Sequence, residues 1–228
     1  MILALGGGLV VVALGGFGFI YFVLFPTSSP KPFSLSTSRV AVPVSSSTEL
    51  AGRWTVAAGS VAGYRVREKL AFLPAESDAV GRTSAITGAA ALAVSGSTVT
   101  VKAASFSVDV TKLKSNETMR DQHIRTLGIQ SATYPTATFV LSSPVTFPAG
   151  ALSGKVFDTS VTGVFRIHGT SKTETVRVQT RLSSAELAAV GSLTFPWSEF
   201  NMTAPSVGGF VSVTNRATME FDLLLKHG

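Results

Sequence analysis

The sequence predicts an all-β protein, an antiparallel barrel of about eight strands with one or two short helices, preceded by a single transmembrane helix. Three observations support this prediction. Apolar and polar residues alternate in several short runs, turn-forming residues separate these runs, and residues 1–25 contain no Asp, Glu, Lys or Arg. Alternation from one residue to the next is typical of strands with one buried and one solvent-exposed face.

Residues 2–25 consist of 24 apolar residues and glycines, with Tyr21 as the only polar group. A helix of that length is about 36 Å long and can cross the roughly 30 Å of bilayer hydrocarbon. The stretch lacks the positive n-region, the short apolar core and the small-residue cleavage site of a secretory signal. We therefore predict an uncleaved transmembrane anchor.

Residues 26–49 are predicted to form a flexible linker, because 15 of these 24 residues are Pro, Ser or Thr. Such a segment buries too little surface to order itself, and its random-coil reach is roughly 25–30 Å. Lys31 and Arg39 follow the anchor and no Lys or Arg precedes it, so a literal count of positive charges places the following body in the cytoplasm. The composition of the linker is common in stalks outside the membrane and favours the opposite orientation.

Residues 50–228 are predicted to form the barrel. Alternation is clearest at residues 105–111, 161–168, 176–181 and 219–226. Turn signals lie at residues 58–60, 95–97, 148–150 and 168–172. Short connections between such strands predict hairpins and an antiparallel meander.

One stretch departs from alternation. Residues 115–127 lack Gly and Pro, and they are predicted to form a helix with Ser115 as its N-cap and an ion pair between Asp121 and Arg125. A second helical turn is expected near residues 75–81. The helix is expected to lie across one end of the sheet.

Arg120 and Asp121 of the predicted helix are expected to be structural. Arg120 lies three residues after Glu117, which is the spacing of an ion pair on a helix surface. Either side chain can also fix the following loop by hydrogen bonds to backbone groups, which are stronger when one partner is charged.

The sequence carries no enzyme signature. There is no Cys, which excludes disulfides, cysteine nucleophiles and thiolate metal sites. The G-x-S-x-G, H-E-x-x-H and phosphate-binding glycine motifs are all missing. Basic residues are scattered without a platform of exposed aromatic residues, so nucleic-acid binding is not expected. We predict a protein that is not an enzyme, with no catalytic residues, metal or cofactor.

Two stretches resemble the signatures of the YceI-like family. The first is Arg-Asp-Gln-His-Ile-Arg at residues 120–125 followed by Tyr-Pro-Thr-Ala-Thr-Phe at 134–139, and the second is residues 161–172. Residues 54–56, 60–68 and 86–88 resemble the opening of that family, so the resemblance covers roughly residues 52–226. It implies an antiparallel lipocalin-like barrel that binds polyisoprenoid-type or other amphiphilic lipids in an elongated apolar cavity. It also implies an exported domain without established catalytic residues, so we expect the barrel to be extracytoplasmic.

The expected ligand-binding residues are those on the apolar faces of the strands, because the polar faces of a closed barrel need the water outside. They are Phe106, Val108, Phe139, Leu141, Phe165, Ile167, Phe221 and Leu223. The expected partners are a long-chain isoprenoid or other amphiphilic lipid and, through the N-terminal helix, a membrane. The alternative is an envelope protein–protein interaction module whose barrel is filled by these side chains and holds no ligand. The volume of the barrel interior distinguishes the two hypotheses.

Overall fold

The computed structural model describes residues 29–35, 43–44, 47–70, 76–207 and 211–228. The predicted anchor, residues 2–25, lies outside the described residues. Within them, no helix is both long enough and apolar enough to cross a membrane.

Strands make up most of the described chain. They are β1 (Gly52–Val56), β2 (Val61–Leu70), β3 (Glu76–Thr83), β4 (Ile86–Ser95), β5 (Thr98–Asp109), β6 (Thr136–Leu141), β7 (Val145–Thr146), β8 (Phe157–Ile167), β9 (Thr170–Leu182), β10 (Leu187–Pro196), β11 (Ser206–Val207) and β12 (Val211–His227). The helical elements are α2 (Thr118–His123), a π-helical turn η3 (Ile124–Gly128), and four short 3-10 helices, η1 (Ser47–Leu50), η2 (Val110–Lys112), η4 (Ala151–Ser153) and η5 (Trp197–Phe200).

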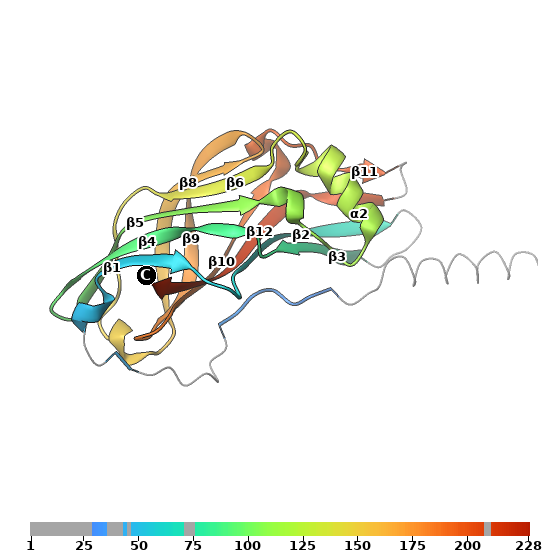
Figure 1. Cartoon of the computed structure of the whole chain (residues 1–228). Helices are drawn as coiled ribbons and strands as arrows, with labels where there is room; N and C mark the ends of the chain where they lie inside the picture. Colours follow the sequence, from blue (N-terminus) through green and yellow to red (C-terminus); the bar gives the residue numbers. More distant parts are fainter. Residues whose placement is uncertain (1–28, 36–42, 45–46, 71–75, 208–210) are drawn as a thin grey trace, which may run out of the picture. The chain divides into compact units, whose positions relative to one another are not determined.

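The strands close into a barrel. Their order is β1-β4-β5-β6-β8-β9-β10-β12-β2-β3, and an additional pairing of β1 with β12 closes the sheet. β1 and β2 follow each other along one edge of β12, because Val56 pairs with Leu225 and Val61 with Asp222. β4 and β3 pair with β1 and β2 in the same way. The result is a closed antiparallel barrel of eight strands with one short α-helix at one end (Figure 1). This confirms the all-β barrel part of the predicted fold class, while the preceding transmembrane helix stays a prediction.

Two predicted turns illustrate why the chain reverses where it does. The connection between β4 and β5 turns at Gly96, with φ of +58°, and the connection between β8 and β9 turns at Gly169, with φ of +73°. Glycine adopts these positive φ angles without the steric cost that a side chain would bring. Turns are also present at residues 58–59 and 149–150, as predicted.

The prediction of a helical turn at residues 75–81 is wrong, because β3 begins at Glu76. β3 pairs with β2 along its whole length, from Glu76 opposite Lys69 to Thr83 opposite Ala62. Ala79 is completely buried on the inner face. Ladder hydrogen bonds and burial on the sheet outweigh the local turn propensity of this segment.

The single helix predicted for residues 115–127 is shorter than expected and changes its pitch. α2 begins at Thr118, with Glu117 rather than Ser115 as its N-cap, and it passes into the wider turn η3. In the described part of the chain Asp121 does not pair with Arg125. Its carboxylate instead accepts a hydrogen bond of 2.8 Å from the backbone N–H of Ser115 and so fixes the loop before the helix.

The buried apolar residues form two clusters, one at each end of the barrel. The end covered by α2 and η3, called the helix end below, includes Phe165, Trp197 and Phe200. The opposite end, called the η1 end below, includes Leu50 and Trp54. η1 and η4 lie at that second end (Figure 1).

Part of the segment predicted to be a linker contacts the outside of the barrel. On β3, the Arg82 Nη2 atom donates a hydrogen bond of 2.7 Å to the carbonyl of Lys31, and its guanidinium lies 3.9 Å from the centre of the Phe33 ring. Further along, the backbone N–H of Val44 donates to the carbonyl of Leu152 in η4. These contacts attach Lys31, Phe33 and Val44 to the barrel wall.

Candidate functional site

The interior of the barrel contains a cavity of about 210 Å³. A cavity of about 10–15 Å³ is already large enough for one water molecule, so the side chains leave the barrel hollow. The wall includes Phe195 and Trp197 from the cluster of the helix end, and Val101 and Phe147 from the cluster of the η1 end. The cavity therefore extends between the two clusters.

All eight residues predicted to bind a ligand lie in the wall of this cavity. They come from β5, β6, β8 and β12, and they are Phe106, Val108, Phe139, Leu141, Phe165, Ile167, Phe221 and Leu223. Strand alternation explains this result, since every second residue of a closed barrel points inward. Their contact with a ligand stays a prediction.

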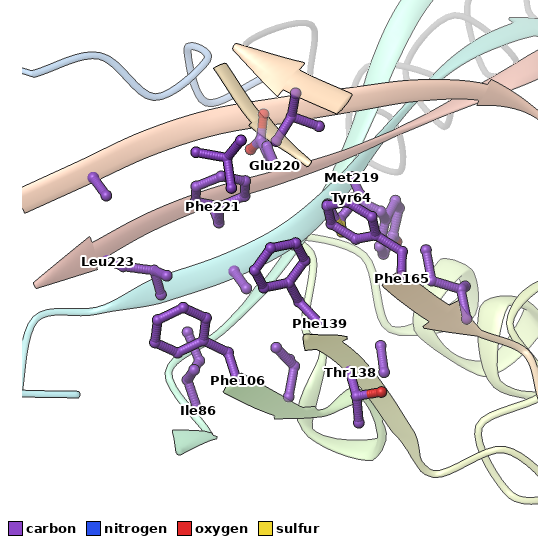
Figure 2. A pocket seen from close by; sticks show the side chains of 18 of the residues that line it. Tyr64, Ile86, Phe106, Thr138, Phe139, Phe165, Met219, Glu220, Phe221 and Leu223 are labelled. Atoms are coloured by element: carbon purple, nitrogen blue, oxygen red, sulfur yellow. The ribbon is translucent and has the colours of Figure 1, made fainter. Parts of the chain in front are cut away.

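Three aromatic rings cross the wall from strand to strand. Phe106 lies opposite Phe139, and Phe139 lies opposite Phe165, on β5, β6 and β8. Their ring centres are 6.3 Å and 4.8 Å apart. Phe221 projects from β12 on the other side of the cavity (Figure 2). The four rings give the middle of the cavity a large apolar surface.

Glycines opposite these aromatic residues explain why the interior stays open. A Cβ atom on Gly163 would lie 2.2 Å from the Phe139 ring, and one on Gly191 would lie 2.6 Å from the Phe221 ring. Each ring therefore covers a glycine on the neighbouring strand and occupies the space of the missing side chain. Because the rings lie against the wall, they do not fill the centre.

The wall presents no free charge to the cavity. Glu220 is the only Asp, Glu, Lys or Arg among the described residues that line the cavity. Because Met219 and Phe221 on either side of it point inward, its carboxylate points to the outer face of the barrel. The Glu220 side chain is 3% exposed, and its carboxylate accepts hydrogen bonds of 3.2 Å from Arg65 and 2.7 Å from Arg82. An apolar wall of this kind suits an uncharged hydrocarbon chain, because a buried charge without a partner is costly.

A buried ion pair closes the helix end. The Nε and Nη2 atoms of Arg120 in α2 each donate a hydrogen bond of 2.9 Å to the carboxylate of Glu68 in β2. The two side chains are only 10% and 8% exposed. Burial acts to lower the pKa of Arg120, but the hydrogen bonds and the charge of Glu68 outweigh it, so this pKa is raised. The expected ion pair with Glu117 is therefore wrong, while the structural role expected for Arg120 agrees with this geometry.

Tyr64 is a wall residue that the sequence analysis missed. Its ring lies over Gly81 of β3, where a Cβ atom would be 2.3 Å from the ring. Burial raises the pKa of the Tyr64 phenol, an effect that the nearby charge of Arg120 only partly opposes. Ser115 is close to the phenol, but its hydroxyl is bonded to the backbone of Glu117. Among the described residues the Tyr64 hydroxyl has no hydrogen-bond partner. Alternation of Ala62, Tyr64 and Val66 in the sequence would have identified it.

His168 is the first residue of the turn predicted at residues 168–172. It does lie in the turn between β8 and β9, with φ of +50°, but its ring also lines the cavity. Its Nε2 atom is 3.1 Å from the Oε1 atom of Gln130 and donates to it, which leaves Nδ1 as the acceptor. This Nδ1 atom is buried beside the ring of Tyr134 and has no hydrogen-bond partner within the described segments. A turn position in a sequence does not show where the side chain points.

His123, on α2, has a local partner. Its Nδ1 atom is 2.8 Å from the carbonyl oxygen of Met119, one helical turn earlier. In the described part of the chain, no group of three or more His, Asp and Glu side chains could hold a metal ion.

Comparisons with known proteins agree with this architecture. Residues 54–225 match the sequence profile of the YceI-like domain. A polyisoprenoid binding domain from Saccharophagus degradans, implicated in plant cell wall breakdown, is similar in structure with a TM-score of 0.55 and 14% identity, over 78% of this chain and 99% of that one. BcnA from Burkholderia cenocepacia has a TM-score of 0.52 and 22% identity, over 72% of this chain and 95% of its own. At these identities the likeness concerns the fold. A search of curated proteins finds no significant match.

Proposed function

Since this chain belongs to the YceI-like domain family, we propose that it binds a polyisoprenoid or similar amphiphilic lipid inside its barrel. The hollow apolar interior of about 210 Å³ is the observation that carries this proposal. Burial of an isoprenoid chain there would contribute about 0.8 kcal/mol per CH₂ group. The structurally similar domain from Saccharophagus degradans is described as polyisoprenoid binding. An interaction module with a filled barrel fits the cavity less well.

The proposed role is binding without catalysis. The cavity wall is apolar, and the carboxylate of Glu220 is held by Arg65 and Arg82 on the outer face of the barrel. A general acid or base needs a titratable group that can reach a reacting atom, and a carboxylate engaged by two arginines is poorly suited to that task. The protein would therefore hold or carry its lipid unchanged.

Residues 2–25 are proposed to tether this barrel to a membrane, with the barrel on the extracytoplasmic side. The support is the run of 24 apolar residues and glycines and the Ser-, Thr- and Pro-rich segment that follows it. A reporter enzyme that works only after export, fused behind Gly228, is expected to be active. Activity of a reporter that works only in the cytoplasm would contradict this orientation.

Lipid extraction from the purified full-length protein tests the binding proposal. We expect mass spectrometry to find a long-chain amphiphile in the wild type and much less of it in Ala104→Trp, because Ala104 faces the cavity. Ala103→Trp is the matched control, since this neighbouring side chain is exposed on the outer face. The same detergent must be used for all three proteins. Absence of specific lipid from the wild type, or equal amounts in both variants, would contradict the proposal.

A further inference from the structure

Two buried polar atoms at the helix end have no hydrogen-bond partner in the described part of the chain. One is the hydroxyl of Tyr64 and the other is Nδ1 of His168. Both residues line the cavity, and Tyr64 is 7% exposed. Buried polar atoms in folded proteins are nearly always paired, so unpaired ones at a cavity wall need an explanation.

The chemistry of the two atoms defines what can pair with them. The Tyr64 hydroxyl can donate one hydrogen bond. His168 carries its proton on Nε2, which donates to Gln130, so its Nδ1 atom can only accept. The Tyr64 hydroxyl therefore needs an oxygen acceptor, and the His168 Nδ1 atom needs a polar hydrogen. A hydroxyl group on a ligand can accept from Tyr64 or donate to His168.

The charges around the cavity favour an uncharged head group. No Lys or Arg is present among the described residues that line the cavity, and the carboxylate of Glu220 is paired with Arg65 and Arg82 on the outer face of the barrel. Arg120, whose charge acts on the Tyr64 phenol, is already engaged by both oxygens of Glu68. A diphosphate would therefore lose its hydration inside the barrel without gaining a counter-charge.

We infer that the cavity selects lipids with an uncharged, hydroxyl-bearing head, of the class of free isoprenoid alcohols, and that this head is buried at the helix end, where it pairs with Tyr64 or His168. This inference rests on the proposed function and names the ligand class of the same cavity. In this arrangement the apolar wall contacts the hydrocarbon chain of the lipid, and the unpaired polar atoms are available to its head group.

Binding of three probes with matched C20 chains to the full-length protein tests the inference. The probes are geranylgeraniol, geranylgeranyl diphosphate and the corresponding hydrocarbon without oxygen, each competing with tritiated geranylgeraniol. We expect the alcohol to bind about tenfold more tightly than the hydrocarbon, as the loss of a buried hydrogen bond implies. We also expect it to bind at least tenfold more tightly than the diphosphate.

Tyr64→Phe removes only the hydroxyl that has no partner in the structure, so this variant is expected to fold. It should weaken binding of the alcohol about tenfold and leave binding of the hydrocarbon unchanged. A purely structural role for Tyr64 would change both. Tyr134→Phe is the control, because the Tyr134 hydroxyl is not one of the buried unpaired atoms.

The outcomes separate this inference from the proposed function. If the diphosphate binds as tightly as the alcohol, the inference is overturned and lipid binding stands. The same holds if Tyr64→Phe weakens binding of the alcohol and of the hydrocarbon equally, or of neither. Failure of all three probes to bind overturns both. If Tyr64→Phe does not fold, the order of the three probes on the wild type decides, and a preference for the diphosphate or the hydrocarbon overturns the inference.

Discussion

The two ends of the barrel are closed by different chemistry. At the helix end, Arg120 and Glu68 form an ion pair whose side chains are 10% and 8% exposed. At the η1 end, Leu50 and Trp54 are 1% and 0% exposed, and the Trp54 indole donates to the Leu50 carbonyl. A buried ion pair is costly when one partner is lost, whereas an apolar closure depends mainly on filled volume. The helix end should therefore be sensitive to charge, and the η1 end to the size of its side chains.

Arg120→Met is expected to have the largest effect on stability. It leaves the buried carboxylate of Glu68 unpaired and should lower the free energy of unfolding by about 3–5 kcal/mol. Chemical denaturation with circular dichroism measures this change. The double variant Arg120→Met with Glu68→Leu should recover most of the loss, since no charge then remains buried. If Arg120→Met alone lowers the free energy of unfolding by less than about 1 kcal/mol, the ion pair does not stabilise the helix end appreciably.

Leu50→Ala applies the corresponding test to the η1 end. Loss of this buried side chain should cost about 2–3 kcal/mol, the lower part of the range for such substitutions, because η1 is short and can relax. The loss should not depend on salt concentration, because the substitution removes no charge. Glu49→Ala is the control, because Glu49 precedes Leu50 and is exposed. A similar loss in the control would point to a helix effect rather than to burial.

Asp121→Ala should have a smaller effect at the helix end. Its carboxylate holds the backbone N–H of Ser115 at 2.8 Å, a charged hydrogen bond worth about 1.5 kcal/mol. The melting temperature should fall, while lipid affinity per folded molecule should change little. Asp121→Asn retains an acceptor oxygen and should lose less. Loss of binding at unchanged stability would place Asp121 in the site instead of in the scaffold.

Alkaline pH should weaken the helix end slightly more than the η1 end. Burial raises the pKa of Tyr64 above the unfolded value near 10. Its protonated form therefore contributes stability that is present below pH 10 and is lost as pH rises toward the folded pKa. Between pH 10 and 11 the wild type should lose about 1 kcal/mol that Tyr64→Phe does not lose. Melting temperatures across this interval measure the difference, and Tyr134→Phe should behave like the wild type.

Local sequence patterns were sufficient to predict the barrel and much of its lining. Side chains alternate strictly along a strand, so a single buried position defines the inner face of the whole run. This is why the predicted residues of β5, β6, β8 and β12 all line the cavity. On β2 the inward positions Ala62, Tyr64 and Val66 alternate in the same way. The next inward position is Glu68, a buried charge that alternation does not predict.

Features that depend on contacts between distant residues could not be predicted in this way. The local spacing rule selects Glu117 as the partner of Arg120, while the actual partner, Glu68, lies on another element. The open interior depends on which glycine lies beside which ring, as with Gly163 and Phe139, and this follows from strand pairing. The helical turn expected at residues 75–81 failed for the same reason, since pairing with β2 makes that segment a strand.

The position of β12 also determines when the barrel can form during synthesis. β12 pairs with β10 on one edge and with β2 and β1 on the other, so that His227 lies opposite Trp54. Of the described strands it is the last to leave the ribosome, which adds about 5–20 residues per second. Until then β10 and β2 both expose unpaired edges, and contacts so distant in the sequence form slowly. The growing chain therefore has no enclosed interior, and the cavity forms only once β12 has paired with both of its neighbours.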